Sequence, residues 1–210
     1  AFLADLGVLS ERLIAAHCIH VTPDDIALLK QNDVAVAHCI GANTKSAKGV
    51  APVKAMLEAG IRVGLGTDGP SSGNTLDLFV QMRMFANFHK THLQDRAAFP
   101  ARDIVRLATL GGAEVLGLAD KIGSLETSKK ADIVLVETDS ANMFPIFDPY
   151  AVLVYSAHAG NVSDVFINGV PIVSGKQLLT QDLAALKTTL ASEMKDFIKQ
   201  AERNEKKTIL

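Results

Sequence analysis

The stretch that decides the fold is IRVGLGTDGPSSGN, residues 61–74. Val63 to Leu65 form a short apolar run that predicts a buried strand, and glycines frame Asp68 in the loop that follows it. A carboxylate held where a buried strand leaves an α/β sheet is typical of a metal ligand or a general base. The alternative is that Asp68 caps a helix or ties a turn, and this stretch alone favours neither reading.

Two earlier apolar runs predict strands of the same kind. Residues 13–16 lead into His17, and residues 34–37 lead into His38. Helices are predicted after each of them, one beginning at the N-cap Thr22 and ending near residue 32, the other over residues 50–59. Strands that alternate with helices in this way predict a parallel sheet with right-handed crossovers.

Each of the three strands ends in a chemically active side chain. His17, His38 and Asp68 occupy equivalent positions, so parallel pairing would place them on one rim of the sheet. A single histidine at a strand end is more often a hydrogen-bonded structural residue. Two histidines and an aspartate at neighbouring strand ends indicate a functional site.

The rest of the chain predicts more helices and a small β unit. Loops are expected over residues 41–49 and 70–73, and helices over residues 2–8, 75–93, 101–117 and 180–204. Short strands are predicted over residues 132–136, 162–167 and 171–173. Asn168-Gly169 joins the last two of them and is a strong signal for a hairpin turn.

Composition narrows the class of protein. The formal net charge is 21 − 23 = −2, which gives no basic footprint for nucleic acid. No apolar run approaches the length of a membrane span, so we expect neither a nucleic-acid nor a membrane partner. Cys18 and Cys39 are too few for a disulfide framework and predict a reducing, cytoplasmic location.

Other enzyme signatures fit the sequence poorly. Residues 64–69 match the glycine pattern of a dinucleotide site, but no second strand ending in an acid follows at the required distance. The serine-hydrolase elbow and the P-C-x-x-C zinc signature of nucleobase deaminases are both absent. A metal-dependent hydrolase fits better, because it needs a carboxylate to move a proton and neutral histidines to bind or orient. Such a site needs three or more protein ligands, of which His17 and Asp68 supply only part.

The motifs in this order resemble the amidohydrolase superfamily, and more narrowly its methylthioadenosine/S-adenosylhomocysteine deaminases and triazine chlorohydrolases. The resemblance runs to about residue 175. It is carried by residues 15–20 (AAHCIH), 37–39 (AHC) with Asn43 and Lys45, 64–69 (GLGTDG) with Ser72, 108–113 (ATLGGA), 123–126 (GSLE), 130–134 (KADIV) and Asn168-Gly169.

The resemblance implies a fold and a division of the chain. The fold would be α/β, the carboxyl-terminal part of a (β/α)8 metal-dependent hydrolase barrel with a small β-sandwich. Residues 1–119 would hold barrel strands six to eight, residues 120–176 part of the β-sandwich, and residues 177–210 a carboxyl-terminal helix. An amino-terminal half of the barrel is the implied partner, and we also expect a homo-oligomer.

The resemblance also implies roles for three residues. Asp68, which ends strand eight, would bind the metal and the substrate and shuttle the proton. His17, which ends strand six, would contact the attacking water or the group attacked, and Ser72 would line the substrate pocket. The cofactor would be one divalent metal ion, zinc or alternatively iron.

The implied reaction is hydrolytic deamination of a purine-like or related N-heterocycle, a small-molecule substrate, by metal-activated water. The alternatives are a triazine-type chlorohydrolase and a non-catalytic remnant of the same fold. In that remnant, His17 and Asp68 would be structural.

This chain departs from the family's pattern in three places. Its residues 38–43 read HCIGAN where the family has His-Cys-Pro-x-Ser-Asn, and Ser128 replaces a common glycine. The H-x-H of strand one and the H-x-x-E of strand five have no counterpart. The metal ligands and the second acid–base group that those motifs carry in the family are therefore missing.

We predict that residues 1–210 do not form a folded, active monomer alone. Parallel strands rely on cover over both faces, and their exposed edges invite aggregation. Each large apolar side chain left bare forfeits roughly 1.5–3 kcal/mol, and a few of them match a domain's whole stability of about 5–15 kcal/mol. The test is to purify the chain alone and measure its oligomeric state, metal content and ammonia release. A monomer with a sharp unfolding transition, bound metal and turnover would contradict the prediction.

Overall fold

A three-stranded parallel sheet forms the centre of the molecule. The computed structural model describes residues 2–208, with side chains as far as residue 202. Strands β1 (Ile14–Ala16), β2 (Ala35–His38) and β3 (Val63–Leu65) pair in the order β1-β2-β3. Ala15 lies opposite Val36, and Ala37 lies opposite Gly64. The three strands predicted from the apolar runs are confirmed.

Helices connect the strands as predicted. Helix α2 (Pro23–Gln31) begins with a capping box in which the Thr22 hydroxyl accepts from the Asp25 backbone and the Asp25 side chain accepts from the Thr22 backbone. Helix α4 (Val53–Glu58) precedes β3, and Lys30 of α2 donates to the Gly60 carbonyl oxygen at 3.0 Å. The two crossover helices are therefore joined at the end from which β3 begins.

Two predicted loops were wrong in detail. The loop expected over residues 41–49 contains helix α3 (Ile40–Lys45), and the loop after Asp68 contains the short helix α5 (Pro70–Gly73). Lys45 donates from Nζ to Asn74 Oδ1, which joins the end of α3 to the end of α5. Both segments are rich in glycine and small polar residues, which favour loops locally, and burial of Ile40 overrides that preference in α3.

The helix expected over residues 101–117 is also broken. It consists of α7 (Ala101–Ala108) and α8 (Leu110–Val115), with Thr109 between them at φ −119° and ψ −92°. The break turns α8 onto β3, where Gly111 and Gly112 approach the strand closely. Packing against the strand thus interrupts a continuous helical pattern in the sequence.

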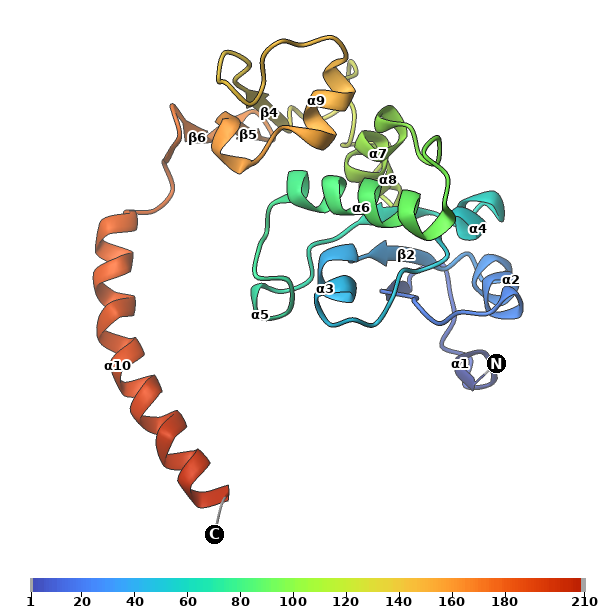
Figure 1. Cartoon of the computed structure of the whole chain (residues 1–210), viewed down its shortest axis with the longest axis horizontal. Coiled ribbons are helices and arrows are strands. Elements are labelled where there is room, and N and C mark those ends of the chain that lie inside the picture. The colour runs from blue at the N-terminus through green and yellow to red at the C-terminus, as the bar shows by residue number, and fades with distance from the viewer. Residues whose placement is uncertain (1, 209–210) are drawn as a thin grey trace.

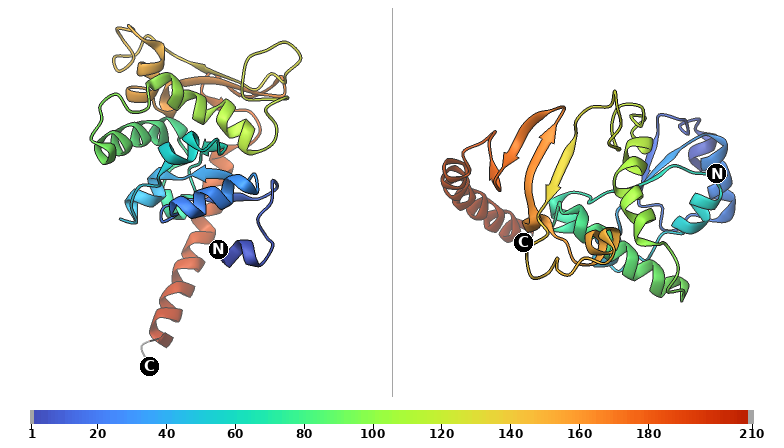
Figure 2. Two further views of the ribbon diagram at one scale, coloured as in Figure 1. Left: turned by 90° about the vertical axis from the view of Figure 1, so that its right-hand side faces the viewer. Right: turned by 90° about the horizontal axis from the view of Figure 1, so that it is seen from above.

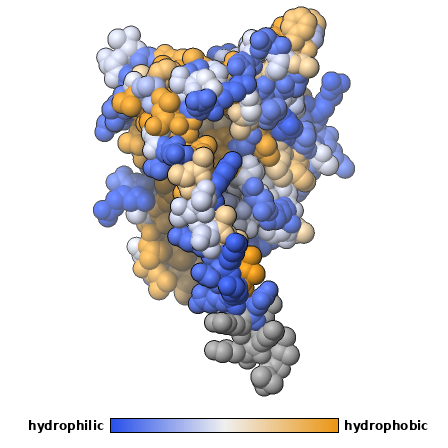
Figure 3. All heavy atoms as spheres, turned by 90° about the vertical axis from the view of Figure 1, so that its left-hand side faces the viewer, coloured by the Kyte–Doolittle hydropathy of each residue, from blue (hydrophilic) through white to orange (hydrophobic). Residues whose placement is uncertain are grey.

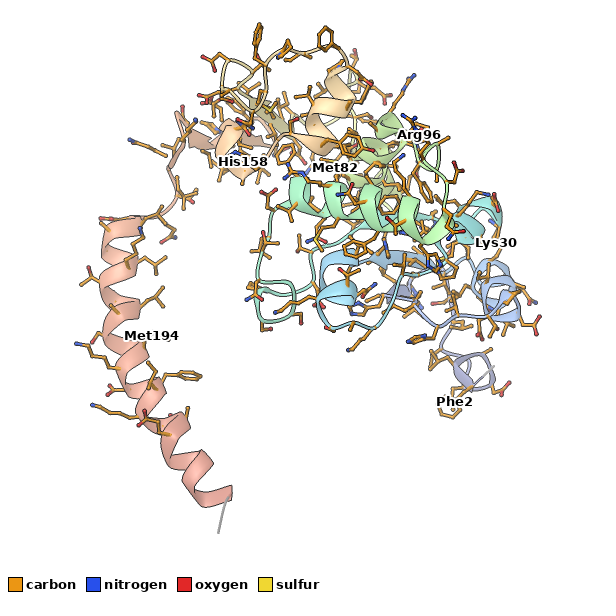
Figure 4. The ribbon with its side chains drawn as sticks, in the orientation of Figure 1. Phe2, Lys30, Met82, Arg96, His158 and Met194 are labelled. Atoms are coloured by element: carbon orange, nitrogen blue, oxygen red, sulfur yellow. The ribbon has the colours of Figure 1, made fainter. Side chains whose placement is uncertain are left out.

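Helix α6 (Leu78–Leu93) covers the sheet and carries the next layer (Figure 1). It begins at the N-cap Asp77, later than the predicted residue 75, because the Asp77 carboxylate accepts from the backbones of Phe79 and Val80. Phe85 of α6 is fully buried, and α6 contacts β3, α3, α7 and α9. Met82, labelled in Figure 4, lies on the same helix and is also buried.

A second sheet lies above α6. It pairs β4 (Ile133–Val136), β5 (Val162–Ile167), β6 (Val170–Ser174) and β7 (Gln177–Leu178) in antiparallel order. The predicted hairpin is confirmed, since Asn168 and Gly169 both have positive φ between β5 and β6. The sequence reading missed β7 and two segments before β5, helix α9 (Pro149–Tyr155) and the 3₁₀ turn η1 (Ala159–Asn161).

Helix α9 and the turn after it tie the second sheet to α6. Asp148 caps α9 by accepting from the Tyr150 backbone, with Pro149 at the first helical position. Arg83 of α6 donates to the Ala157 carbonyl oxygen at 2.7 Å. Asp77, the cap of α6, accepts from the Ala159 backbone at 2.8 Å.

Apolar side chains are exposed at several places, among them both ends of the described residues. Helix α1 (Phe2–Asp5) precedes β1, an edge strand on which Ile14 is 40% exposed. Helix α10 (Leu183–Thr208) runs away from the body (Figures 1 and 2). None of the helices within residues 2–208 combines the length and hydrophobicity that a bilayer crossing requires.

The contact between β3 and α8 yields a stability prediction. A Cβ on Gly64 would lie 2.8 Å from Gly112 Cα, which is backbone and cannot move aside easily. Gly64→Ala should therefore destabilise the fold by about 1–3 kcal/mol, as overpacking does. Gly112→Ala is the matched control, because a Cβ there meets nothing within 4 Å. Unfolding of the complete protein in urea measures both, and equal stabilities for the two variants would refute this account of the contact.

Candidate active site

His17 and Asp68 leave their strands through left-handed backbone conformations. His17 has φ 67° and the following Cys18 has φ 46°, while Asp68 has φ 58°. Residues other than glycine adopt such angles rarely, and they concentrate at functional sites. The His17 backbone still donates to Ala37 and the Gly66 backbone to His38, each at 3.0 Å, so the ladder holds until both strands end.

The two side chains meet over the end of β2. His17 Nε2 lies 3.7 Å from Asp68 Oδ2, and both side chains remain partly exposed. The other carboxylate oxygen, Oδ1, accepts from the Gly69 backbone at 2.7 Å. Asp68 was expected either to stabilise a turn or to serve as a metal ligand or general base. Each expectation fits one of its oxygens, because Oδ1 stabilises a turn while Oδ2 faces the histidine.

Asn43 fixes the histidine ring from behind. Its Oδ1 lies 2.7 Å from His17 Nδ1, and the residue is 1% exposed at the centre of α3. An amide oxygen can only accept, so Nδ1 carries a proton, and in the neutral ring Nε2 keeps its lone pair toward Asp68. The sequence motif contains Asn43 but does not predict that this residue orients His17. The signal available was its position in the segment after His38.

A cavity of about 380 Å³ opens at this pair of side chains. It brings together all three residues singled out for the site, His17, Asp68 and Ser72. The cavity is lined by His17, Ile19, His20, Ala42, Asn43, Ser46, Lys48, Asp68 and Ser72.

His38 does not join the other two strand ends. It is fully buried and directs Nε2 toward His89 Nε2 of α6, at 3.0 Å, with the ring of Phe85 beside both. Burial lowers the pKa of His38 to about 3 and that of His89 to about 4, and the neighbouring histidine adds to the effect at His38. His38 thus belongs to the core, although the strand pattern had placed it on the rim with His17.

The donor types at the cavity suit a divalent metal ion. A carboxylate oxygen and an imidazole nitrogen with a free lone pair are ligands that zinc accepts. No group of three or more histidine, cysteine, aspartate or glutamate side chains that could hold a metal occurs in the part of the chain that the structure describes. Cys18 and Cys39 are free thiols, and burial raises the pKa of both.

Comparison with known proteins places this chain in a family. Residues 1–172 match the amidohydrolase family. The chain belongs to that family. The resemblance inferred from the motifs is confirmed, and the mixed α/β content fits the amidohydrolase fold.

The amidohydrolase relatives are named for two reactions. The chain is 41% identical over 194 residues to a 5-methylthioadenosine/S-adenosylhomocysteine deaminase of Moorella thermoacetica, covering 92% of this chain and 45% of that protein. A zinc-bound adenosine deaminase of Xanthomonas campestris matches with a TM-score of 0.89 and 37% identity, covering 95% of this chain and 45% of that one. The zinc complex of an atrazine chlorohydrolase from Arthrobacter aurescens matches with a TM-score of 0.82 and 30% identity, covering 91% and 42%. The amidohydrolase chain thus spans about half the length of the relatives it matches.

The buried histidine pair predicts a loss of stability in acid. Both folded-state pKa values, about 3 and about 4, lie below the value of about 6.5 of an unfolded chain. The unfolded state then binds more protons between these values, so the contribution of this pair to the free energy of unfolding is constant above about pH 7 and falls as the pH drops through about 6.5. Urea unfolding of the complete protein across this range measures the slope.

A pair of variants isolates the contribution of these histidines. His89→Gln removes one titrating group and should make the slope shallower, whereas His20→Gln, at an exposed position, should leave it unchanged. An unaltered slope in His89→Gln would contradict the assignment.

Proposed function

We propose that this chain is the carboxyl-terminal portion of a metal-dependent aminohydrolase that deaminates a purine-like or related N-heterocycle. The observation that carries the proposal is the pairing of His17 Nε2 with Asp68 Oδ2 at the mouth of a shared cavity. The deaminase names of the relatives support it. The alternatives kept are a triazine-type chlorohydrolase, which the atrazine enzyme favours, and a non-catalytic remnant.

The proposed roles follow from the atoms that each side chain presents. Bound zinc, or iron in its place, would make water nucleophilic at neutral pH. Asp68 would be one metal ligand, and its Oδ2 would accept the proton of the attacking water and return it to the leaving amino group. His17, held by Asn43, would accept a hydrogen bond at Nε2 and orient that water. Ser72 would contact the substrate from the far side of the loop that contains Asp68.

We also propose a place for this chain in a larger fold. We place β1, β2 and β3 as strands six, seven and eight of a (β/α)8 barrel, within residues 1–119. Residues 120–176 would be part of a small β-sandwich, and residues 177–210 a carboxyl-terminal helix. An amino-terminal half would supply the remaining metal ligands to the rim that carries His17 and Asp68. A homo-oligomer and a cytoplasmic location remain predictions.

The carboxylate of Asp68 can be tested by a nearly isosteric change. In the complete enzyme, Asp68→Asn should lower kcat by about 100-fold or more, because loss of a proton acceptor costs about 10²–10⁴. The bound metal should also decrease, since the amide carries no charge. Asp24→Asn, at an exposed position on α2, is the control and should leave both unchanged. Wild-type turnover in Asp68→Asn would contradict the proposed role of Asp68 as proton acceptor and metal ligand.

Product analysis separates the three proposed functions. The complete enzyme is assayed for ammonia and chloride release with adenosine derivatives, guanine, cytosine and chlorinated triazines, and its metal content is measured. Ammonia from an adenosine derivative supports the deaminase, and chloride without ammonia supports the chlorohydrolase. Neither product, together with no bound metal, supports the remnant.

A further inference from the structure

Gln81 is a polar side chain in the interior of the molecule. Glutamine is mostly found on protein surfaces, and the face of the molecule in Figure 3 carries many polar residues. Gln81 is instead 0% exposed on helix α6. Phe85 and His89, also buried, follow it at intervals of four positions, so the three side chains lie along one face of the helix. That face of α6 packs against residues 38–41.

The amide group of Gln81 is only half used. Its Oε1 accepts from the Gly41 backbone at 2.9 Å, whereas its Nε2 is buried and has no hydrogen-bond partner among the residues that the structure describes. Burying an unpaired amide donor costs free energy that an apolar side chain of similar size would not incur. The bond to Gly41 is therefore what glutamine provides at this position and an apolar residue would not.

Gly41 is the second residue of α3 and needs a hydrogen-bond partner from outside that helix. The first N–H groups of a helix have no intrahelical acceptor, and the N-cap residue Cys39 makes no side-chain cap. Gln81 Oε1 accepts from Gly41 instead. A Cβ at position 41 would lie 2.7 Å from Gln81 Nε2 and 2.8 Å from Oε1, so the close approach depends on glycine. Gln81 thus fixes the beginning of α3 against α6.

Helix α3 contacts both sides of the cavity. Asn43, in the middle of α3, holds His17 Nδ1 at 2.7 Å at the end of β1. Lys45, at the end of α3, donates to Asn74 in the loop that follows β3. Because α3 has only six residues, a shift at its beginning also moves these two side chains.

We propose that Gln81 is a positioning residue for the reaction at His17 and Asp68. Gln81 is not among the residues that line the cavity. It acts through Gly41 and α3 on Asn43, which orients His17 so that Nε2 lies 3.7 Å from Asp68 Oδ2. The inference rests on the proposed function for its effect on turnover, whereas the hydrogen bond of the His17 ring can be measured without a substrate.

Steady-state kinetics of the complete enzyme test the effect on turnover. Gln81→Met removes the acceptor but keeps a side chain of similar length. It should lower kcat at least about tenfold and change KM less than about threefold, because a displacement of about 1 Å at a reacting group can cost ~10²-fold. Gln81→Glu keeps an accepting oxygen and should restore kcat to within about threefold of the wild type.

A variant elsewhere in the core controls for a general loss of stability. Ile104 is fully buried on α7, and Ile104→Val removes one methylene group from the core. This variant should lower the urea midpoint of the complete enzyme, as cavity-forming changes do, and leave kcat unchanged.

A double-mutant cycle tests whether Gln81 acts through Asn43. Asn43→Ala alone should lower kcat at least as much as Gln81→Met does. Adding Gln81→Met to Asn43→Ala should then lower kcat no further, since residues on one route are not additive. If Gln81→Met does not fold, Gly41→Ala takes its place in the cycle, because the added Cβ would displace the same amide.

The His17 ring gives a readout that needs no substrate. In NMR spectra of the complete protein with isotope-labelled histidine, the Nδ1–H signal of His17 is assigned from its absence in His17→Asn. A ring proton held by Asn43 at 2.7 Å exchanges slowly with water, so the signal should be present in the wild type and in Ile104→Val. It should be broadened or lost in Gln81→Met, because a shifted α3 weakens that bond.

Three results would overturn the inference. They are wild-type kcat in Gln81→Met, losses of kcat that multiply in the double variant, and an unchanged His17 signal in Gln81→Met. A wild-type enzyme that releases neither ammonia nor chloride from the substrate panel would contradict the proposed function instead. Loss of the His17 signal in Gln81→Met, with the signal kept in Ile104→Val, would then still support the positioning role.

Discussion

The site depends on the register of the parallel ladder. Ala15 pairs with Val36 and Ala37 with Gly64, so β1 and β3 end within one residue of each other along β2. The last ladder bonds are made by the backbones of His17 and Gly66, immediately before the chain turns away on each side. Because side chains alternate between faces along a strand, a slip of one residue would turn His17 or Asp68 away from the cavity.

Buried polar groups hold this rim in place from behind. Asn43 orients His17, and Gln81 of α6 accepts from the Gly41 backbone at 2.9 Å in the same helix, α3. His38 and His89 make a second buried contact between β2 and α6. Buried hydrogen bonds of this kind specify one arrangement, since a shifted helix would leave their partners unsatisfied. Helix α6 therefore positions the site without reaching the cavity.

Local signals in the sequence predicted the elements whose formation depends on neighbouring residues along the chain. The apolar run before Asp68 gave β3 with its observed bounds, Thr22-Pro23 gave the start of α2, and Asn168-Gly169 gave the hairpin. Strand order alone predicted that His17 and Asp68 lie on one rim of the sheet, but the same argument wrongly placed His38 there. The motif resemblance added the family.

Features set by tertiary contacts could not be predicted in this way. The break at Thr109 depends on how closely α8 approaches β3. The helical periodicity of the sequence contains no information on that distance. The inward turn of His38 depends on His89, which lies 51 positions later and looks like an ordinary helix residue in the sequence. Helix α9 had a readable start at Asp148-Pro149, but its seven residues are too few to show a period.

The left-handed backbone at the end of β1 limits what evolution can place there. His17 and Cys18 both have positive φ, a region that β-branched residues adopt with difficulty and that proline cannot enter. Natural or selected variants at position 18 should therefore be drawn from glycine, asparagine and small unbranched residues, although a half-buried site beside a strand would otherwise accept valine or isoleucine. The backbone dihedral angles at this position therefore restrict its sequence variation more than the space around the side chain does.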